Sequence, residues 1–265
     1  MENIKITELS NVSSTASTDL ILLSTNTASS ATSRSITVND LQSNIGVLSN
    51  DLTVTVSTGL TTAQIQTLIN NTPHNLNGYN ITFQFGAETH VLSQSLSFVG
   101  FVGGALLIRG ADTTADLNTS QTTIFDGSAL ATRGILIANC PLVHIFNLKV
   151  LFDSTASFIP ALDISAATVN ISFCWFVGEA GGSNDGRGIF MQQSNAFVYK
   201  NYFTAGNYGI YAYNCSDCFA RENDDTGTQP KVGIYSRASI VYLQDNAITG
   251  STIDTDSING GQIFS

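Results

Sequence analysis

Charged residues are scarce in this sequence, and positively charged ones are the scarcest. Only 11% of the 265 residues are charged, and 10 Lys and Arg stand against 20 Asp and Glu, for a net charge of −10. Nucleic-acid-binding surfaces need clusters of Lys and Arg, so we expect no nucleic-acid partner. The hydrophobic share is 43%, which is enough for a sizeable core and indicates a folded protein.

A run of apolar residues long enough to cross a membrane is also missing. The longest mostly apolar run, Phe98 to Ile108, is short and rich in Gly, whereas a spanning helix needs about 20 apolar residues. Residues 1–20 contain Glu2, Glu8 and Asp19 and lack the apolar centre of a secretory signal peptide. We therefore expect no membrane insertion and synthesis in a cytosol.

Cysteine and histidine are too few, and too scattered, to form a cofactor site. Cys215 and Cys218 have the spacing of half a zinc or redox motif, but no second pair completes it. His74, His90 and His144 lie in different regions of the sequence and suggest no catalytic triad. We expect neither a metal nor a cofactor.

A repeat fills the C-terminal half of the sequence. Five short segments open with Gly-Ile or, once, with Ala-Leu; they start at Gly134, Ala161, Gly188, Gly209 and Gly233. A period of roughly 21 to 27 residues indicates a solenoid, in which each coil buries its apolar side by stacking on its neighbours. The strand-forming composition, with many Gly and Asn, predicts an all-β fold, a right-handed parallel β-helix.

Alternation within each coil separates inward from outward side chains. The first and third residues after each opening should point inward: Ile135, Leu162, Ile189, Ile210 and Ile234, with Ile137, Ile164, Met191, Ala212 and Ser236. The residues between them, which include Phe190, Tyr211 and Tyr235, should point outward. The register of the second strand in each coil is not assigned.

Phe190, Tyr211 and Tyr235 should form a continuous aromatic strip, because stacked strands lie about 4.8 Å apart. Gln192, Tyr213 and Arg237 flank it. Two interpretations stay open. Aromatic rings beside Arg, Gln and Tyr hydroxyls are typical of glycan-binding grooves, and outward aromatic patches are also typical of subunit interfaces.

Two further columns recur about once per coil. One is predicted to form a ladder of side-chain amides at a turn; it comprises Asn147, Cys174, Asn201, Asn223 and Asn246. The other is a column of small residues, counted six positions after each opening: Cys140, Ala167, Ser194, Cys215 and Ser239. Both are interpreted as structural.

Four carboxylates are weak candidates for catalysis. Glycoside hydrolysis needs two carboxyl groups at a defined separation, and loops of neighbouring coils could bring together Glu179, Asp185, Glu222 and Asp224. Acidic residues beside Gly and Asn are, however, ordinary turn residues. We therefore expect no catalysis, with a polysaccharide hydrolase or lyase as the alternative.

The sequence is divided into three parts. Residues 1–46 contain short strands separated by Ser/Thr-rich loops and form a small extended module. Residues 47–80 are a linker with one strand and one helix, over 61–71, that Thr61 or Thr62 caps. This helix is expected to cover the end of the β-helix, which occupies residues 81–265.

The first part resembles the virion-attachment segment of bacteriophage tail fibres and tailspikes. The matching residues are Ile6-Thr7-Glu8-Leu9, Asp19-Leu20-Ile21-Leu22 and Ile36-Thr37-Val38-Asn39-Asp40-Leu41. The remainder resembles the pectate-lyase-like right-handed β-helix domains that such proteins carry.

This resemblance implies a structural, receptor-binding tail protein in the virion, made in the host cytoplasm. It implies a homotrimer, attachment to other tail or baseplate proteins through residues 1–46, and recognition of a bacterial surface polysaccharide. It carries over no catalytic residue; a depolymerase of the tailspike type is the alternative.

Overall fold

The computed structural model describes residues 20–25, 32–37, 47–112, 121–152, 159–178, 186–214, 216–225, 228–248, 250 and 253–265. Side chains are described from residue 47 onward, except those of residues 253 and 254. In the first part of the chain, β1 (Leu20–Thr25) pairs antiparallel with β2 (Thr32–Thr37). The attachment-like residues 6–9 and 38–41 lie outside the described ranges, so that interpretation stays a prediction.

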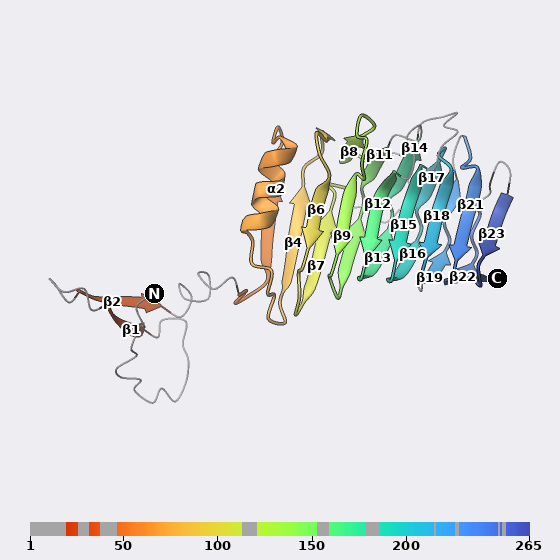
Figure 1. Cartoon of the computed structure of the whole chain (residues 1–265). Coiled ribbons are helices and arrows are strands. Elements are labelled where there is room, and N and C mark those ends of the chain that lie inside the picture. The colour runs from red at the N-terminus through yellow and green to blue at the C-terminus, as the bar shows by residue number, and fades with distance from the viewer. Residues whose placement is uncertain are drawn as a thin grey trace.

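Residues 52–264 wind as a parallel β-solenoid of about seven turns, which confirms the predicted β-helix (Figure 1). Its strands form three parallel sheets. The nine-stranded sheet contains β3 (Leu52–Val56), β4 (Asn80–Phe85), β7 (Ala105–Arg109), β10 (Val143–Phe146), β13 (Thr168–Ser172), β16 (Asn195–Tyr199), β19 (Asp217–Arg221), β22 (Ile240–Gln244) and β24 (Gln262–Phe264). Because β3 pairs with β4, this sheet begins inside the segment predicted as a linker.

The other two sheets complete the cross-section of the solenoid. The six-stranded sheet contains β5 (Thr89–Val91), β8 (Ile124–Gly127), β11 (Lys149–Phe152), β14 (Trp175–Gly178), β17 (Tyr202–Thr204) and β20 (Asp224–Asp225). The seven-stranded sheet contains β6 (Leu96–Val99), β9 (Ile135–Ala138), β12 (Pro160–Ser165), β15 (Arg187–Gln192), β18 (Tyr208–Tyr213), β21 (Val232–Arg237) and β23 (Ile253–Ile258). A typical coil visits the seven-, nine- and six-stranded sheets in turn.

The interior of the solenoid is one continuous apolar cluster. Both predicted inward columns are confirmed, since their members are at most 1% exposed. Aromatic rings are among the largest fully buried side chains, for example Phe83, Phe125, Phe176 and Phe203. Stacking coils therefore supplies the apolar burial that no single coil could achieve.

The repeated glycines are explained by close approach of neighbouring coils. A Cβ atom added to Gly188 would lie 2.7 Å from the carbonyl oxygen of Gly209, and one added to Gly209 would lie 2.6 Å from that of Gly233. A Cβ atom added to Gly134 would likewise lie 2.8 Å from the carbonyl oxygen of Ala161. A side chain at these positions would push the backbones of two coils apart.

The amide ladder is confirmed for Asn201, Asn223 and Asn246. The backbone N–H of Cys174 donates to the side chain of Asn201, that of Asn201 to the side chain of Asn223, and that of Asn223 to the side chain of Asn246, at 2.9–3.1 Å. The assignment of Asn147 to this ladder is wrong. Trp175 aligns with Lys149, so the ladder position in that coil is Leu148, and Asn147 occupies the left-handed turn position before it, with φ 55°.

The column of small residues also forms a hydrogen-bonded ladder. The N–H of Ala167 donates to Ser194 Oγ, that of Ser194 to Ser216 Oγ, and that of Ser216 to Ser239 Oγ, at 3.1–3.3 Å. Ser216 takes the place predicted for Cys215, because the turn in this coil is one residue longer. Cys215 itself lies outside the described residues.

Helix α2 (Thr62–Asn71) covers the first coil at the seven-stranded sheet (Figure 1). Thr61 and Gln64 form a capping box at its start, and Ile65 and Ile69 join the interior cluster. Among the described residues, no helix is long and apolar enough to cross a membrane.

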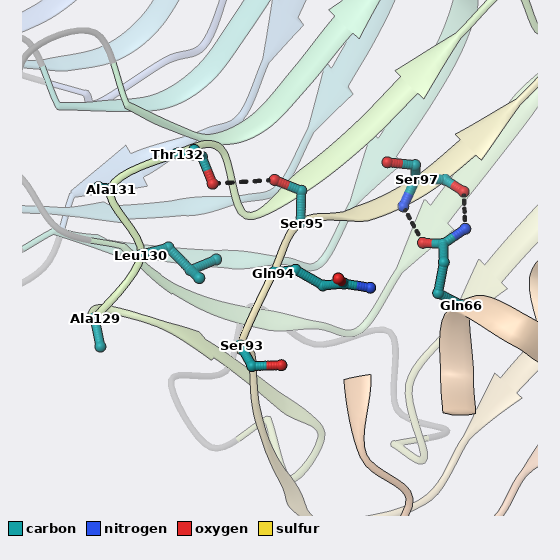
Figure 2. A pocket seen from close by; sticks show the side chains of 9 residues that line it. All are labelled: Gln66, Ser93, Gln94, Ser95, Ser97, Ala129, Leu130, Ala131 and Thr132. Atoms are coloured by element: carbon teal, nitrogen blue, oxygen red, sulfur yellow. Dashed lines mark hydrogen bonds between the residues drawn. The ribbon is translucent and has the colours of Figure 1, made fainter. Parts of the chain in front are cut away.

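The helix also satisfies the open edge of β6 with a side chain. Gln66 Oε1 accepts from the N–H of Ser97 at 2.8 Å, and Gln66 Nε2 donates to the carbonyl of Ser97 at 3.0 Å (Figure 2). One amide thus replaces the neighbouring strand at the point where an edge would be left unpaired.

Candidate functional site

The outer face of the seven-stranded sheet carries the predicted aromatic strip. Phe190, Tyr211 and Tyr235 occupy equivalent positions on β15, β18 and β21, so the predicted register is confirmed. Gln192, Tyr213 and Arg237 occupy the equivalent positions two residues later. Asp163 precedes Phe190 in the same column, and Asp256 follows Tyr235.

The strip is packed into a second apolar cluster, which we call the outer cluster: Phe190, Tyr208, Tyr211, Tyr213, Val232 and Tyr235. Tyr211 is 6% exposed and Tyr235 is 8% exposed. Their ring centroids lie 4.6 Å apart, and the Tyr208 ring lies 5.0 and 5.1 Å from them. The accessible surface of this cluster is therefore contributed by its half-buried members, Phe190, Tyr208 and Tyr213.

Sequence reasoning missed Tyr208 and Val232, although both precede a repeat opening by one residue. The predicted alternation runs forward from each Gly, whereas strands β18 and β21 begin one residue before it. An aromatic or β-branched residue directly before Gly-Ile was the available signal.

Two arginines stack on the outer cluster. The Arg187 guanidinium lies 4.2 Å from the centroid of Tyr211 and 4.7 Å from that of Phe190. The Arg237 guanidinium lies 5.4 Å from the centroid of Tyr213. Such cation–π contacts hold both the ring and the charge in place. Burial raises the pKa of Tyr235 to about 12, with Tyr211, Tyr208 and Asp256 acting in the same direction and Arg237 in the opposite one.

Asp163 adds a carboxyl group at the border of the cluster. It is 8% exposed, and its Oδ2 lies 2.7 Å from a guanidinium nitrogen of Arg133. Burial raises the pKa of Asp163, while Arg133 and Arg187 counteract this effect. The face thus combines aromatic rings, phenol hydroxyls, guanidinium groups and one buried carboxyl group.

The weak catalytic candidates do not join this face. Glu222 lies in the turn between β19 and β20, with φ 50°, and contacts Arg221 at 2.8 Å and Lys200 at 3.5 Å. Asp224 begins β20 in the six-stranded sheet, where its Oδ1 accepts from the N–H of Asp225 at 2.8 Å. Glu179 and Asp185 lie outside the described residues, so their role stays a prediction.

A second aromatic column, which we call the aromatic ladder, lies on the outer face of the nine-stranded sheet: Phe197, Phe219, Tyr242 and Phe264. These side chains are 38%, 37%, 46% and 46% exposed. These residues are not among the predicted site residues, because the repeated Gly positions do not set the register of the second strand in each coil. An aromatic residue between two small or apolar ones recurs in each strand, as in Cys218-Phe219-Ala220, and this alternation was the available signal.

An open pocket of about 650 Å³ lies beside α2, between the turns before β6 and β9. Its lining is Gln66, Ser93, Gln94, Ser95, Ser97, Ala129, Leu130, Ala131 and Thr132 (Figure 2). Gln66 is engaged with Ser97, and Ser95 donates to the carbonyl of Arg133 at 2.5 Å. None of the lining side chains is titratable, so the pocket offers hydrogen bonds and no acid–base chemistry.

In the part of the chain that the structure describes, no three His, Cys, Asp or Glu side chains gather in a way that could hold a metal ion. Cys140, Cys174 and Cys218 are buried free thiols, and burial raises the pKa of Cys174 and of Cys218 to about 12. Thiols held protonated in this way are structural rather than reactive. No protein-family model matches this sequence, and no curated protein matches it significantly.

Proposed function

We propose that this protein is a structural, receptor-binding β-helix of the bacteriophage-tail type, which recognises a bacterial surface polysaccharide without cleaving it. The supporting observation is the outer cluster, where aromatic rings and two arginines share one face of the seven-stranded sheet. Sugars pack their C–H faces on aromatic rings, and their hydroxyl groups bind to Arg, Gln and Tyr side chains.

Binding is expected at the accessible border of the outer cluster. Phe190, Tyr213, Gln192 and Arg237 are half-buried, so each keeps a face or a polar group for a ligand. Tyr211 and Tyr235 are nearly covered and serve as a rigid support. Preorganised rings lose little conformational freedom on binding, which favours recognition of a weakly apolar ligand.

Attachment to the virion through residues 1–46 belongs to the same proposal and is supported by the resemblance of that segment to tail-fibre attachment segments. In this arrangement, other tail or baseplate proteins hold the N-terminal module. The solenoid then projects its glycan-binding face toward the host.

The test is binding to an array of purified bacterial capsule and lipopolysaccharide glycans. We expect the double variant Tyr213→Ala/Arg237→Ala to bind the recognised glycan at least about tenfold more weakly, because it loses one stacking ring and one donor. Tyr202→Ala, on the six-stranded sheet, is the matched control. Wild-type affinity in the double variant would overturn the assignment of this face.

The polysaccharide depolymerase remains the second candidate, because Asp163 has a raised pKa beside the proposed glycan-binding face. Perturbed carboxyl groups of this kind can act as general acids. Asp256, in the same column, is four strands away, or about 19 Å, whereas paired glycosidase carboxyls lie about 5–9.5 Å apart. New reducing ends released by the wild type and not by Asp163→Asn would establish the enzyme.

A further inference from the structure

We propose that the aromatic ladder is the surface through which copies of this chain pack side by side, with their solenoid axes parallel. This interface lies on a different sheet from the proposed glycan-binding face. The inference therefore goes beyond the proposed function and does not depend on it.

The aromatic ladder is an exposed apolar strip that continues over four coils. Phe197, Phe219, Tyr242 and Phe264 align in register across β16, β19, β22 and β24. Each keeps 37–46% of its surface exposed, in contrast to the nearly covered Tyr211 and Tyr235. Aromatic side chains are enriched in protein interfaces, and contiguous exposed apolar patches mark them.

The orientation of the rings argues for a protein partner rather than a sugar. Phe197 and Phe219 stack at 5.4 Å with an interplanar angle of 8°, and Tyr242 and Phe264 stack at 5.3 Å with an angle of 19°. Within each pair one ring therefore lies over a face of the other, which leaves fewer free ring faces for a ligand. Sugars stack on ring faces, whereas ring edges pack well against the apolar and aromatic side chains of a protein.

The charges beside the ladder determine how two copies can face each other. Strand β19 carries Asp217 at its start, Phe219 at its centre and Arg221 at its end. Asp217 is exposed, and the Arg221 side chain is 41% exposed. The residues aligned with Asp217 in β16 and β22 are Asn195 and Ile240, and those aligned with Arg221 are Tyr199 and Gln244. One border of the face is therefore acidic and the other basic at the same coil.

These borders favour parallel over antiparallel packing. A rotation axis that runs along the solenoid brings the Asp217 border of one copy against the Arg221 border of the next, at the same height. A twofold axis across the solenoid would instead bring like borders together, with Asp217 facing Asp217. Glu222 forms an ion pair with Arg221 in the adjoining turn, but Lys200 also contacts that carboxylate, so this border keeps a positive group for the partner. Charge complementarity of this kind sets the orientation of an interface more than its strength.

The aromatic ladder is the apolar part of a larger face, the outer side of the whole nine-stranded sheet, and the contact is proposed to extend over that face. Nine strands spaced about 4.8 Å apart, each about 16 Å long, give a surface of roughly 600 Å² per copy. Two copies would then cover roughly 1,200 Å², at the lower end of stable protein–protein interfaces. Closed rotational symmetry, with two or three copies about the axis, is the usual outcome for such a surface.

The first experiment measures the molar mass of the intact protein by light scattering after size exclusion. We expect the wild type to have two or three times the 28.1 kDa of one chain, and Phe219→Asp to have the mass of one. Val91→Asp introduces the same charge at a position that is 68% exposed on the six-stranded sheet, and it should leave the mass unchanged. A monomeric wild type, or a folded Phe219→Asp variant with unchanged mass, would overturn the proposal.

The second experiment tests orientation by cross-linking, so that it remains informative if Phe219→Asp fails to fold. Single variants Asp217→Cys and Arg221→Cys are prepared in a Cys215→Ser background, mixed as unfolded chains, refolded and oxidised. Parallel packing predicts disulfides between the two different variants, and little cross-linking of Asp217→Cys alone. Efficient disulfide formation between two copies of the Asp217→Cys variant would show antiparallel packing and contradict the proposed arrangement.

Discussion

Asn201 donates both its backbone N–H and its side-chain Nδ2 to the same oxygen, Oδ1 of Asn223, at 3.0 Å in each case. Both side chains are at most 1% exposed. Asn223 in turn donates from Nδ2 to the carbonyl of Val198 at 2.8 Å. A buried amide can be tolerated at this depth because its donors and acceptor are bound, and the turn N–H groups of successive coils are satisfied by the same ladder.

Replacing Asn223 with an apolar residue should therefore destabilise the solenoid, even though the surrounding interior is apolar. Asn223→Leu introduces the residue type that occupies the equivalent ladder position at Leu148. It leaves the backbone N–H of Asn201 without its acceptor. An unsatisfied buried group costs about 1–3 kcal/mol, which we expect to find in urea unfolding. Gln244→Ala, at the exposed end of β22 in the next coil, should stay within about 0.5 kcal/mol of wild type.

Gly209→Ala should also destabilise the fold, since its Cβ would lie 2.6 Å from the carbonyl oxygen of Gly233. Crowding of this kind typically costs about 1–3 kcal/mol, and backbone rather than a side chain must move here. Thermal unfolding measures the effect. Ala161→Gly, at the one described opening that already carries a methyl group, is the control and should cost no more than about 1 kcal/mol. Equal melting temperatures for Gly209→Ala and wild type would show that the coils are not in tight contact.

The first strand of each coil could be predicted from the sequence and the second could not, for a physical reason. Gly positions are required by contact between coils, so they recur and set the register of Ile189, Ile210 and Ile234. The turn that follows varies in length, and Ser216 is seven residues after Gly209 whereas Ser194 is six after Gly188. Counting along the sequence therefore fails at the turn, since hydrogen bonding and not spacing selects the residue that joins the ladder.

The burial of the aromatic strip was equally inaccessible to pattern reasoning. Alternation shows that Tyr211 points outward, but it does not show that the Tyr208 ring and the Arg187 guanidinium cover it. That covering depends on residues before the Gly, where the backbone no longer follows the simple alternation of the strand. Exposure, and with it the choice between support and binding surface, requires the three-dimensional arrangement.

Gln66→Leu should open the edge of the first coil without removing the helix. The amide of Gln66 satisfies both backbone groups of Ser97, so its loss should accelerate hydrogen exchange of the Ser97 N–H by at least about tenfold, as expected for the loss of about 1.4 kcal/mol of local protection. Gln66→Glu keeps an acceptor for the N–H and should exchange at an intermediate rate. Gln94→Leu is a control at an exposed position of the same pocket. Unchanged exchange in Gln66→Leu would mean that this side chain does not cap the edge.

Stability should fall as the pH is lowered from 7 to 5, because burial lowers the pKa of two histidines in the folded protein. Burial lowers the pKa of His90 from its usual 6.5, although Glu88, 3.2 Å away, partly counteracts this; burial also lowers the pKa of His144. Below pH 6.5 the unfolded chain therefore binds protons that the folded chain does not, and stability decreases until the folded pKa values are reached. His90→Phe, which fits between Phe85 and Phe125, should reduce the slope of unfolding free energy against pH, and adding His144→Asn should reduce it further. Asp163 contributes in the opposite direction, because its raised pKa lets the folded state bind a proton at a higher pH than the unfolded chain does. The slopes are therefore compared between variants that all keep Asp163. A His90→Phe variant with the wild-type slope would show that His90 is protonated equally in both states and is not held neutral by its burial.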